Sequence, residues 1–300
     1  MSLIALGEQV LNGLVLSVFY ALAALGLAII FGVLKIVNFA HGELYMIGGF
    51  AYYGVASAVG LPPPVAVLAA FALLFALGTA IEWLLIRPVH EGGVERPDEY
   101  AIMITFGLAI LLQNLMLSLF GPWTLRPPAL FRGAVEIGEL IVSGDRLAAA
   151  ALGLVLIAIV IYLLRWTWAG KAIRAVSQDR ETAAVVGVDN RLVGMLAFGL
   201  GSALAGAAGA LMGPVFLVHP TMGVIPAIKA YVVVVIGGMG SVPGAIVGAL
   251  LLGQVENLAT VLIPDTTRAV AYKDAYGLVL LVLVLLLRPQ GLFGERTRRL

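Results

Sequence analysis

Long apolar runs divide most of this 300-residue chain into segments that are long enough to cross a membrane. A helix needs about twenty apolar residues to span the hydrocarbon core of a bilayer. The clear candidates are Val10–Phe31, Val65–Ile86, Ile102–Phe120, Leu147–Leu164, Leu192–Val218 and Ala275–Leu287. Each run is continuous rather than alternating between apolar and polar residues, so the pattern predicts membrane helices rather than the strands of a barrel.

Two further apolar regions are irregular. Asn38–Val59 is long enough to span but opens with the polar run Asn38–Glu43, and Ala227–Leu262 is too long for one span. Gly237–Gly244 breaks the second region, where it either exposes half-helix ends near a transport path or forms a tight turn between two helices. We therefore expect an all-α, polytopic membrane bundle of eight to nine transmembrane segments with one broken or re-entrant region. The whole chain, residues 1–300, then forms a single domain.

Small residues recur at every fourth position in two of these regions. Gly201, Ala205, Gly209 and Gly213 form one such ridge, and Gly240, Gly244 and Gly248 form another. Ridges of this kind let the backbones of membrane helices approach closely, so both are expected to serve helix packing.

The composition supports the membrane class. Hydrophobic residues make up 61% of the chain and charged residues 12%, against roughly 25% charged residues in an average soluble domain. The net charge of +1 offers no basis for nucleic-acid binding, and the absence of cysteine excludes disulfides and thiolate chemistry. Because Glu8 precedes the first apolar run and no basic segment does, that run is expected to be a retained span rather than a cleaved signal.

Basic residues predict the orientation, because cytoplasmic loops of membrane proteins carry an excess of lysine and arginine. If residues 166–191 lie inside, twelve of the 18 lysines and arginines fall on that side and six fall outside. The outer six are Arg126, Arg132, Arg146, Lys229, Arg268 and Lys273. This distribution predicts an external N-terminus and a cytoplasmic C-terminus.

The longest charged segment between two spans is Trp166–Arg191. Ile173 and Val176 belong to an apolar stripe with helical spacing, while Lys171 and Arg174 lie three residues apart on one turn. The first part of the segment is therefore expected to be an amphipathic helix at the cytoplasmic membrane surface.

A second, shorter helix is expected to follow in the same segment. Asp179 is a suitable N-cap, Glu181 lies in the first turn, and Gly187 is placed to end the helix in a left-handed conformation. Ala183 is expected on its apolar contact face. A helix, a turn and a second helix at the membrane surface form an element to which a soluble partner protein can bind.

Polar residues near or within the spans are candidates for lining a transport path, because such groups are costly in lipid. The alternative for Asn38, His41 and Glu43 is a helix start, with Asn38 as N-cap and Glu43 accepting hydrogen bonds from the first backbone N–H groups. Gln113 and Asn114 fall in the middle of one span and Glu256 in another; a charged Glu256 must face the bundle interior, an aqueous path or the outer interface. The path candidates are Asn38, His41, Glu43, Gln113, Asn114, Gly238, Gly240, Ser241 and Glu256.

The chain contains no energy source or catalytic motif of its own. Gly170-Lys171 is not a nucleotide-binding loop, because Ala172 follows it and Arg165 occupies the required upstream glycine position. Neither zinc-ligand spacing nor a nucleophile elbow is present. We therefore expect no enzymatic activity, no cofactor and no metal site.

Four motifs resemble those of a known family. They are Val37–Glu43 (VNFAHGE), Gly170–Ala175 (GKAIRA), Gly238–Ala245 (GMGSVPGA) and Arg288–Gly294 (RPQGLFG). In this order, and over nearly the whole chain, they are similar to the H-type permease subunit of bacterial ABC importers for branched-chain amino acids.

A fifth motif lies inside the charged segment. Glu181-Thr182-Ala183 followed by Gly187 resembles the "EAA…G" coupling loop of such permeases, with Thr182 in place of the usual alanine. The resemblance implies that residues 166–191 couple the permease to ATPases, with Lys171, Arg174, Glu181, Ala183 and Gly187 as the contact residues.

The resemblance also implies a location and a set of partners. These are the bacterial inner membrane and its lipid, a second homologous permease, two cytoplasmic ATPases that bind ATP and Mg²⁺, and an extracytoplasmic binding protein. The implied substrates are leucine, isoleucine and valine. Urea or short-chain amides remain an alternative, because their importers use similar permeases. An ion-coupled secondary transporter is a distant alternative that would need carboxylates in broken helices, for which Glu256 is the one serious candidate.

Overall fold

The computed structural model describes residues 3–90, 93–137, 140–262, 269 and 271–294. Its long helices are α1 (Leu3–Leu34), α3 (Pro63–Ile81), α5 (Pro97–Phe120), α6 (Gly144–Trp166), α9 (Asn190–Phe216) and α11 (Val242–Leu262). Within the described residues, six helical stretches are long and apolar enough to cross a membrane. The all-α membrane class predicted from the sequence is therefore confirmed.

Three shorter apolar helices complete the bundle. They are α2 (His41–Tyr53), which a π-helical turn η1 (Gly54–Ala58) extends, α10 (Val224–Gly237) and α13 (Lys273–Leu287). The glycine-rich break separates α10 from α11, and the φ angles of Gly238 and Gly240 are 102° and 83°. Glycine adopts such angles without a steric penalty, so this segment forms a turn between two helices, the second of the two expected alternatives.

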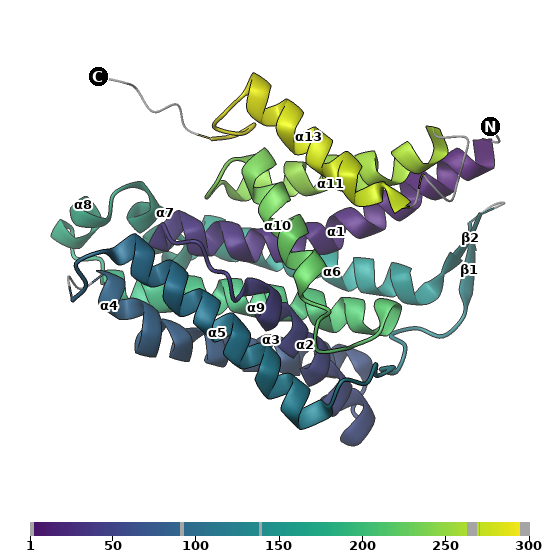
Figure 1. The fold of residues 1–300 in the computed structure, drawn as a ribbon, viewed down its shortest axis with the longest axis horizontal. Coiled ribbons are helices and arrows are strands. Elements are labelled where there is room, and N and C mark those ends of the chain that lie inside the picture. Colours follow the sequence, from purple (N-terminus) through teal and green to yellow (C-terminus); the bar gives the residue numbers. More distant parts are fainter. Residues whose placement is uncertain (1–2, 91–92, 138–139, 263–268, 270, 295–300) are drawn as a thin grey trace.

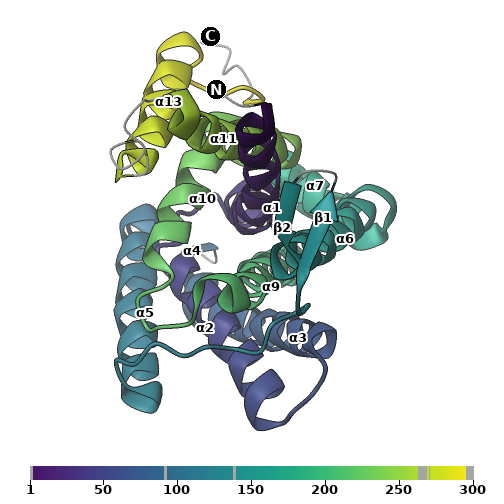
Figure 2. The ribbon, with the colours of Figure 1, turned by 90° about the vertical axis from the view of Figure 1, so that its right-hand side faces the viewer.

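Helix α1 lies at the centre of the bundle. It packs against α6, α9, α10 and α11, and Leu22, Leu25 and Ile30 on it are fully buried. Figures 1 and 2 show α1 running between α11 on one side and α9 on the other. Helix α9 in turn packs against α2 and α3, so α1 and α9 together organise the core.

Small residues let these central helices approach closely. A methyl group at Gly201 of α9 would lie 2.5 Å from the carbonyl oxygen of Gly26 in α1. At Gly209, a methyl group would overlap the carbonyl oxygen of Tyr45 in α2. The predicted packing role of the ridge on α9 is confirmed, because side chains there would push α1 and α2 away.

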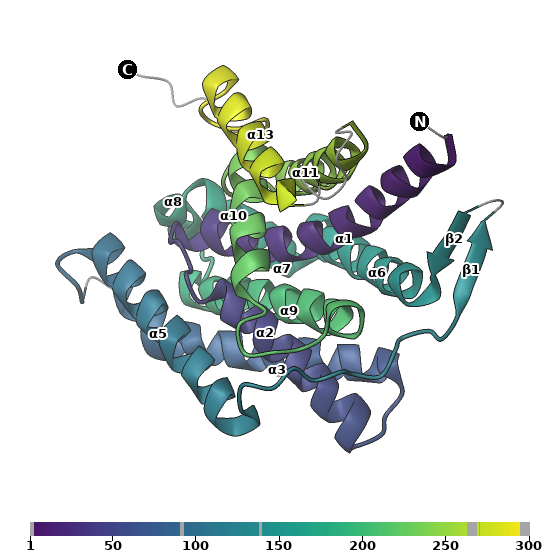
Figure 3. The ribbon, with the colours of Figure 1, turned by 45° about the vertical axis from the view of Figure 1, so that its right-hand side comes forward.

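The two ends of the bundle carry different structures. One end holds the connection after α5 and an antiparallel hairpin of β1 (Ala134–Ile137) and β2 (Leu140–Ser143), which the sequence did not predict. The opposite end holds α4 (Arg87–His90), which follows a π-helical turn η2 (Glu82–Ile86), together with α7 (Trp168–Gln178) and α8 (Arg180–Val185). Figure 1 shows the hairpin and α8 at opposite extremes of the long axis. In Figure 3, α13 and α3 lie at opposite edges.

Candidate functional site

The charged segment between α6 and α9 folds into two short helices, as predicted. Thr167 caps α7, because its hydroxyl oxygen accepts a hydrogen bond from the Gly170 N–H at 3.2 Å. Ile173 and Val176 are buried against the bundle, while Lys171 and Arg174 are exposed. Helix α7 therefore lies with its apolar face on the bundle, while Lys171 and Arg174 remain at the surface.

Asp179 caps α8, as predicted. One of its carboxylate oxygens accepts hydrogen bonds from the N–H groups of Glu181 and Thr182, both at 3.0 Å. The Thr182 hydroxyl donates to the other oxygen at 2.6 Å. The pKa of Asp179 is lowered because the side chain and the N–H of Thr182 donate to its carboxylate. The threonine that departs from the family motif thus supports the helix start.

Gly187 ends the second helix in the predicted conformation. Its φ angle is 89°, and the N–H of Val188 donates to the carbonyl of Ala183 at 3.0 Å. A β-carbon at Gly187 would meet nothing within 4 Å. The requirement for glycine is therefore conformational rather than steric.

One residue of this segment faces the opposite way from the prediction. Ala183 was expected on the contact face, but it is 3% exposed and packs toward the bundle. Val185 and Val186 are instead 86% and 73% exposed. The short helix contains fewer than two turns, so the sequence pattern was too brief to establish which side faces inward. Val185 and the capping residue Val186 are therefore the large apolar side chains exposed at the end of α8, beside the exposed Ala184.

The polar run before α2 is buried at the centre of the bundle. Asn38, His41 and Glu43 are 0%, 1% and 8% exposed. The expected helix start is wrong in detail: α2 begins at His41 with Ala40 as N-cap and no side-chain cap. Asn38 Oδ1 instead accepts from the Ala40 N–H at 3.1 Å in the preceding turn.

These three side chains make only part of their possible hydrogen bonds. His41 Nε2 lies 2.9 Å from the Ala23 carbonyl oxygen, and the Tyr231 hydroxyl donates to the Asn38 carbonyl at 2.5 Å. Within the described residues, Asn38 Nδ2, His41 Nδ1 and Glu43 Oε2 have no hydrogen-bond partner. Because unpaired polar atoms are costly in a bundle interior, this cluster is the strongest candidate for contact with water or a polar solute.

Gln113 and Asn114 lie on α5 at the periphery of the bundle. Gln113 is half-buried and Asn114 is exposed, with its side-chain amide donating to the Ile110 carbonyl at 2.8 Å. Most of α5 is exposed, including the large apolar residues Met103 and Phe106. Both polar residues therefore lie outside the buried core of this chain.

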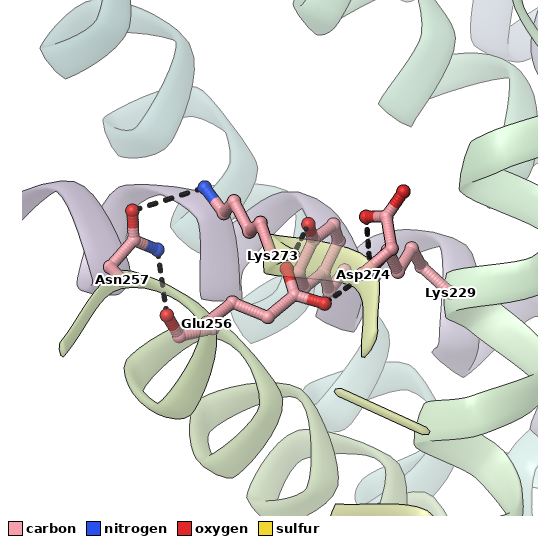
Figure 4. Close-up of polar contacts among 7 residues, drawn as sticks. Lys229, Glu256, Asn257, Lys273 and Asp274 are labelled. Carbon is pink, nitrogen blue, oxygen red and sulfur yellow. Dashed lines mark hydrogen bonds and ion pairs between the residues drawn. The ribbon is translucent and has the colours of Figure 1, made fainter. Parts of the chain in front are cut away.

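Glu256 lies in a buried charge network (Figure 4). It is 0% exposed and forms an ion pair with Lys229 of α10, while the Tyr20 hydroxyl donates to its other oxygen at 2.9 Å. Lys229 also pairs with Asp274 of α13 at 2.8 Å, and Asn257 accepts from Lys273 at 3.2 Å. The network joins α1, α10, α11 and α13.

The sequence did not predict several members of this network, among them Tyr20, Lys229 and Asp274. Lys229 was assigned to an external loop, but it is 5% exposed within α10, and Asp274 was not considered. A signal was present: Lys229 and Glu256 are isolated opposite charges in neighbouring apolar runs. Such charges can be buried only if they pair.

The remaining predicted residues lie in the turn between α10 and α11. Ser241 Oγ accepts from the Gly244 N–H at 3.1 Å, which caps the start of α11. Gly238 packs against Gly294, and Gly240 packs against Gly32 at the end of α1. The nine path candidates therefore occupy four separate places: the start of α2, the face of α5, this turn and the charge network.

Comparisons with known proteins identify the family. The family model for the permease component of branched-chain amino acid transport systems matches residues 9–287. The chain is 31% identical to LivH of Escherichia coli (strain K12) and 33% identical to BraD of Pseudomonas aeruginosa. Both are named high-affinity branched-chain amino acid transport system permease proteins, and each match covers 96% of this chain and 95% of the relative.

A more distant relative comes from Methanocaldococcus jannaschii. It is named a probable branched-chain amino acid transport permease protein LivH and is 24% identical, over 98% of this chain and 95% of its own length. No solved structure matches the chain. With the family model covering nearly all of this multi-pass helical chain, the protein belongs to the family of permease components of branched-chain amino acid transport systems.

Proposed function

We propose that this chain is a transmembrane subunit of an ATP-driven importer that moves leucine, isoleucine and valine into the cytoplasm. The observation that carries the proposal is the family match over residues 9–287, which includes every helix from α2 to α13. The chain itself acts as a transport subunit and not as an enzyme. ATP and Mg²⁺ bind to partner ATPases, and the permease needs no cofactor of its own.

A second, homologous permease is proposed to complete the translocation path. Helix α5 supports this arrangement, because it leaves Asn114 and large apolar side chains exposed on one chain. A partner permease packed against α5 would cover the apolar residues and bring Gln113 and Asn114 to the shared path. An extracytoplasmic binding protein delivers the substrate to this path.

The two ATPases are proposed to bind α7 and α8. These helices lie at one end of the bundle and are anchored to it through Ile173, Val176 and Ala183. Val185 and Val186 present an apolar surface, and Lys171, Arg174 and Glu181 are exposed on the same two helices. Movement of an ATPase would then reach α6 and α9 directly, since both are continuous with this segment.

Transport by the reconstituted complex tests the function. The permease should be co-expressed with the ATPases and the second permease encoded beside it, and placed in liposomes with the secreted binding protein. We expect uptake of labelled leucine that requires ATP and persists when ion gradients are dissipated. Uptake of urea or acetamide instead of leucine would support the amide importer, and loss of uptake on adding ionophores would support an ion-coupled transporter.

Gln113→Leu should lower uptake by the intact complex. The change retains the size of the side chain but removes its amide, which we propose lines the shared path. Uptake should fall while the amount of complex recovered with the permease stays constant. Met103→Leu on the same helix, where Met103 is 73% exposed, is the matched control and should transport normally. Normal uptake by Gln113→Leu would show that the Gln113 side chain does not line the transport path.

The orientation can be tested with single cysteines, since the chain has none of its own. Thr124 follows α5 and Ala184 belongs to α8, and both are exposed. The connection after α5 and helix α8 lie toward opposite ends of the bundle (Figure 1). In intact cells, an impermeant thiol reagent should label Thr124→Cys but label Ala184→Cys only after permeabilisation. The cysteine-free parent gives the background. The reverse pattern would invert the proposed topology.

A further inference from the structure

A large cavity lies at the end of the bundle that carries α7 and α8. Its volume is about 930 Å³. It is bounded by the ends of α1, α6, α7 and α10 and by the beginning of α11, with the segment after α13 along one side. Its apolar wall includes Ile29, Ile173, Val235 and Phe293. Because several membrane helices end around it, the cavity lies at the depth where hydrocarbon gives way to lipid headgroups.

The charged residues that line this cavity are all cations. Lys35 at the end of α1, Arg165 in the last turn of α6 and Arg174 on α7 contribute to its wall, and the lining includes no carboxylate. In the described part of the chain, none of the three forms an ion pair with an acidic side chain. Among the described residues, these three cations therefore line one cavity without a paired carboxylate.

Aromatic residues beside the cavity indicate contact with the membrane interface. Tyr162 and Trp166 stack with their ring centroids 5.5 Å apart, and the Arg165 guanidinium lies 5.1 Å from the Trp166 ring centroid. Both rings are more than half exposed. Exposed tyrosine and tryptophan at a helix end are typical of residues at the level of lipid headgroups.

The exposed face of α6 leads from the hydrocarbon region to these residues. Leu154, Val155, Ile159 and Leu163 are exposed along it, above Tyr162 and Trp166. An acyl chain can lie along this face while its headgroup reaches Arg165. A soluble acidic peptide would gain nothing from these apolar side chains, so the surroundings favour a lipid.

We propose that this cavity binds the phosphate headgroup of an anionic phospholipid. The guanidinium groups of Arg165 and Arg174 can each donate two hydrogen bonds to phosphate oxygens, and Lys35 adds a third positive charge. A zwitterionic lipid carries its own cation and gains less from such a site. Since Arg174 lies on α7, the bound headgroup also fixes the position of the first helix in the segment between α6 and α9.

Lipid retention by the purified permease tests this proposal. The permease is exchanged into detergent with equal amounts of phosphatidylglycerol and phosphatidylcholine, and retained lipid is counted by native mass spectrometry. We expect the parent to prefer phosphatidylglycerol by at least about fivefold, as expected for one or more cations at the membrane surface. The triple variant Lys35→Gln/Arg165→Gln/Arg174→Gln should lose this preference. Arg165→Lys/Arg174→Lys, which keeps the charges, should retain most of it.

A matched control separates the cavity from general surface charge. Arg96→Gln/Arg126→Gln/Arg132→Gln removes the same number of exposed cations, none of which lines the cavity. Its preference for phosphatidylglycerol should equal that of the parent. An equal loss in this control, or no loss in the cavity variant, would overturn the proposal.

Two further outcomes would assign the site to another ligand. If inorganic phosphate at millimolar concentration displaces phosphatidylglycerol, the cavity is a site for free anions and the lipid proposal is wrong. If the cavity variant keeps its lipid preference but no longer retains the ATPases, the three cations serve a soluble partner instead. Size-exclusion chromatography of each variant verifies that the permease is folded, and none of these measurements depends on the transported substrate.

Discussion

Val185→Asp and Val186→Asp should abolish uptake while the permease still inserts into the membrane. The two valines are 86% and 73% exposed at the end of α8, so a charge there costs the isolated bundle little. In the assembled importer, the same surface is proposed to be covered by an ATPase. Burying an unpaired carboxylate in that contact costs several kcal/mol, enough to separate the subunits. Recovery of the ATPases with the tagged permease and leucine uptake should therefore fall together.

Gly187→Val should produce a similar loss by a different route. The φ angle of 89° places Gly187 in the left-handed region, which costs a residue with a β-carbon roughly 1–2 kcal/mol. A branched residue in this position shifts the helix end and moves Val185 and Val186 from their places. Gly187→Asn, which tolerates this region, should retain most of the uptake.

Controls for these variants are available in the same chain. Val186→Ile keeps the apolar surface and should transport normally. Val135→Asp, on the exposed hairpin at the opposite end, should leave ATPase recovery unchanged. Full uptake by Val185→Asp and Val186→Asp would mean that α8 is only a connector. The coupling surface would then have to be sought around α4 or in the turn before α11.

Lys229→Met should destabilise the permease by about 3–5 kcal/mol, because it leaves Glu256 as a buried charge without its cation. Glu256 is 0% exposed, and among the described residues the Tyr20 hydroxyl remains its one hydrogen-bond partner from another helix. Lys273 of α13 interacts with Glu256 electrostatically but does not form a hydrogen bond that replaces the one from Lys229. Asp274 also loses its contact with Lys229, but its side chain is 68% exposed and water can replace the lysine. Thermal unfolding of the purified permease in detergent should show a large fall in melting temperature.

The double variant Lys229→Met/Glu256→Leu should recover most of this stability. Replacing a buried ion pair with apolar side chains of similar size is often neutral, whereas removing one partner is not. We expect uptake to recover with stability, since α1, α10, α11 and α13 enclose the pair. A stable but inactive double variant would instead place Glu256 in the transport mechanism.

An exposed ion pair provides the matched comparison for this network. Arg96 and Glu99 lie 3.1 Å apart with side chains 75% and 59% exposed. Arg96→Met should change stability by less than about 1 kcal/mol, because solvent screens such pairs. An equally large effect at both pairs would show that burial does not determine the strength of the Lys229 contact.

Local features of the molecule were predictable from the sequence. The apolar runs specified most of the helices, because a membrane helix must satisfy its backbone hydrogen bonds within the run itself. The limits of α8 were also predictable from nearby residues. The Asp179 side chain accepts hydrogen bonds from the free N–H groups at the start of the helix, and Gly187 adopts the left-handed conformation that follows its end.

Only the tertiary structure decided how these elements face one another. In the folded chain Ala183 is buried and Val185 is exposed. Helix α8 is too short to show a periodic pattern, so its rotation about its own axis is determined by packing against the bundle. The tertiary structure also joined Lys229 to Glu256 and brought Lys35, Arg165 and Arg174 to one cavity. The members of the ion pair and of the cation cluster come from different parts of the chain. The distances between their side chains depend on which helices are neighbours. Close contacts at Gly26, Gly201 and Gly209 help to determine those neighbours, and a sequence pattern within one helix cannot specify its partner in another.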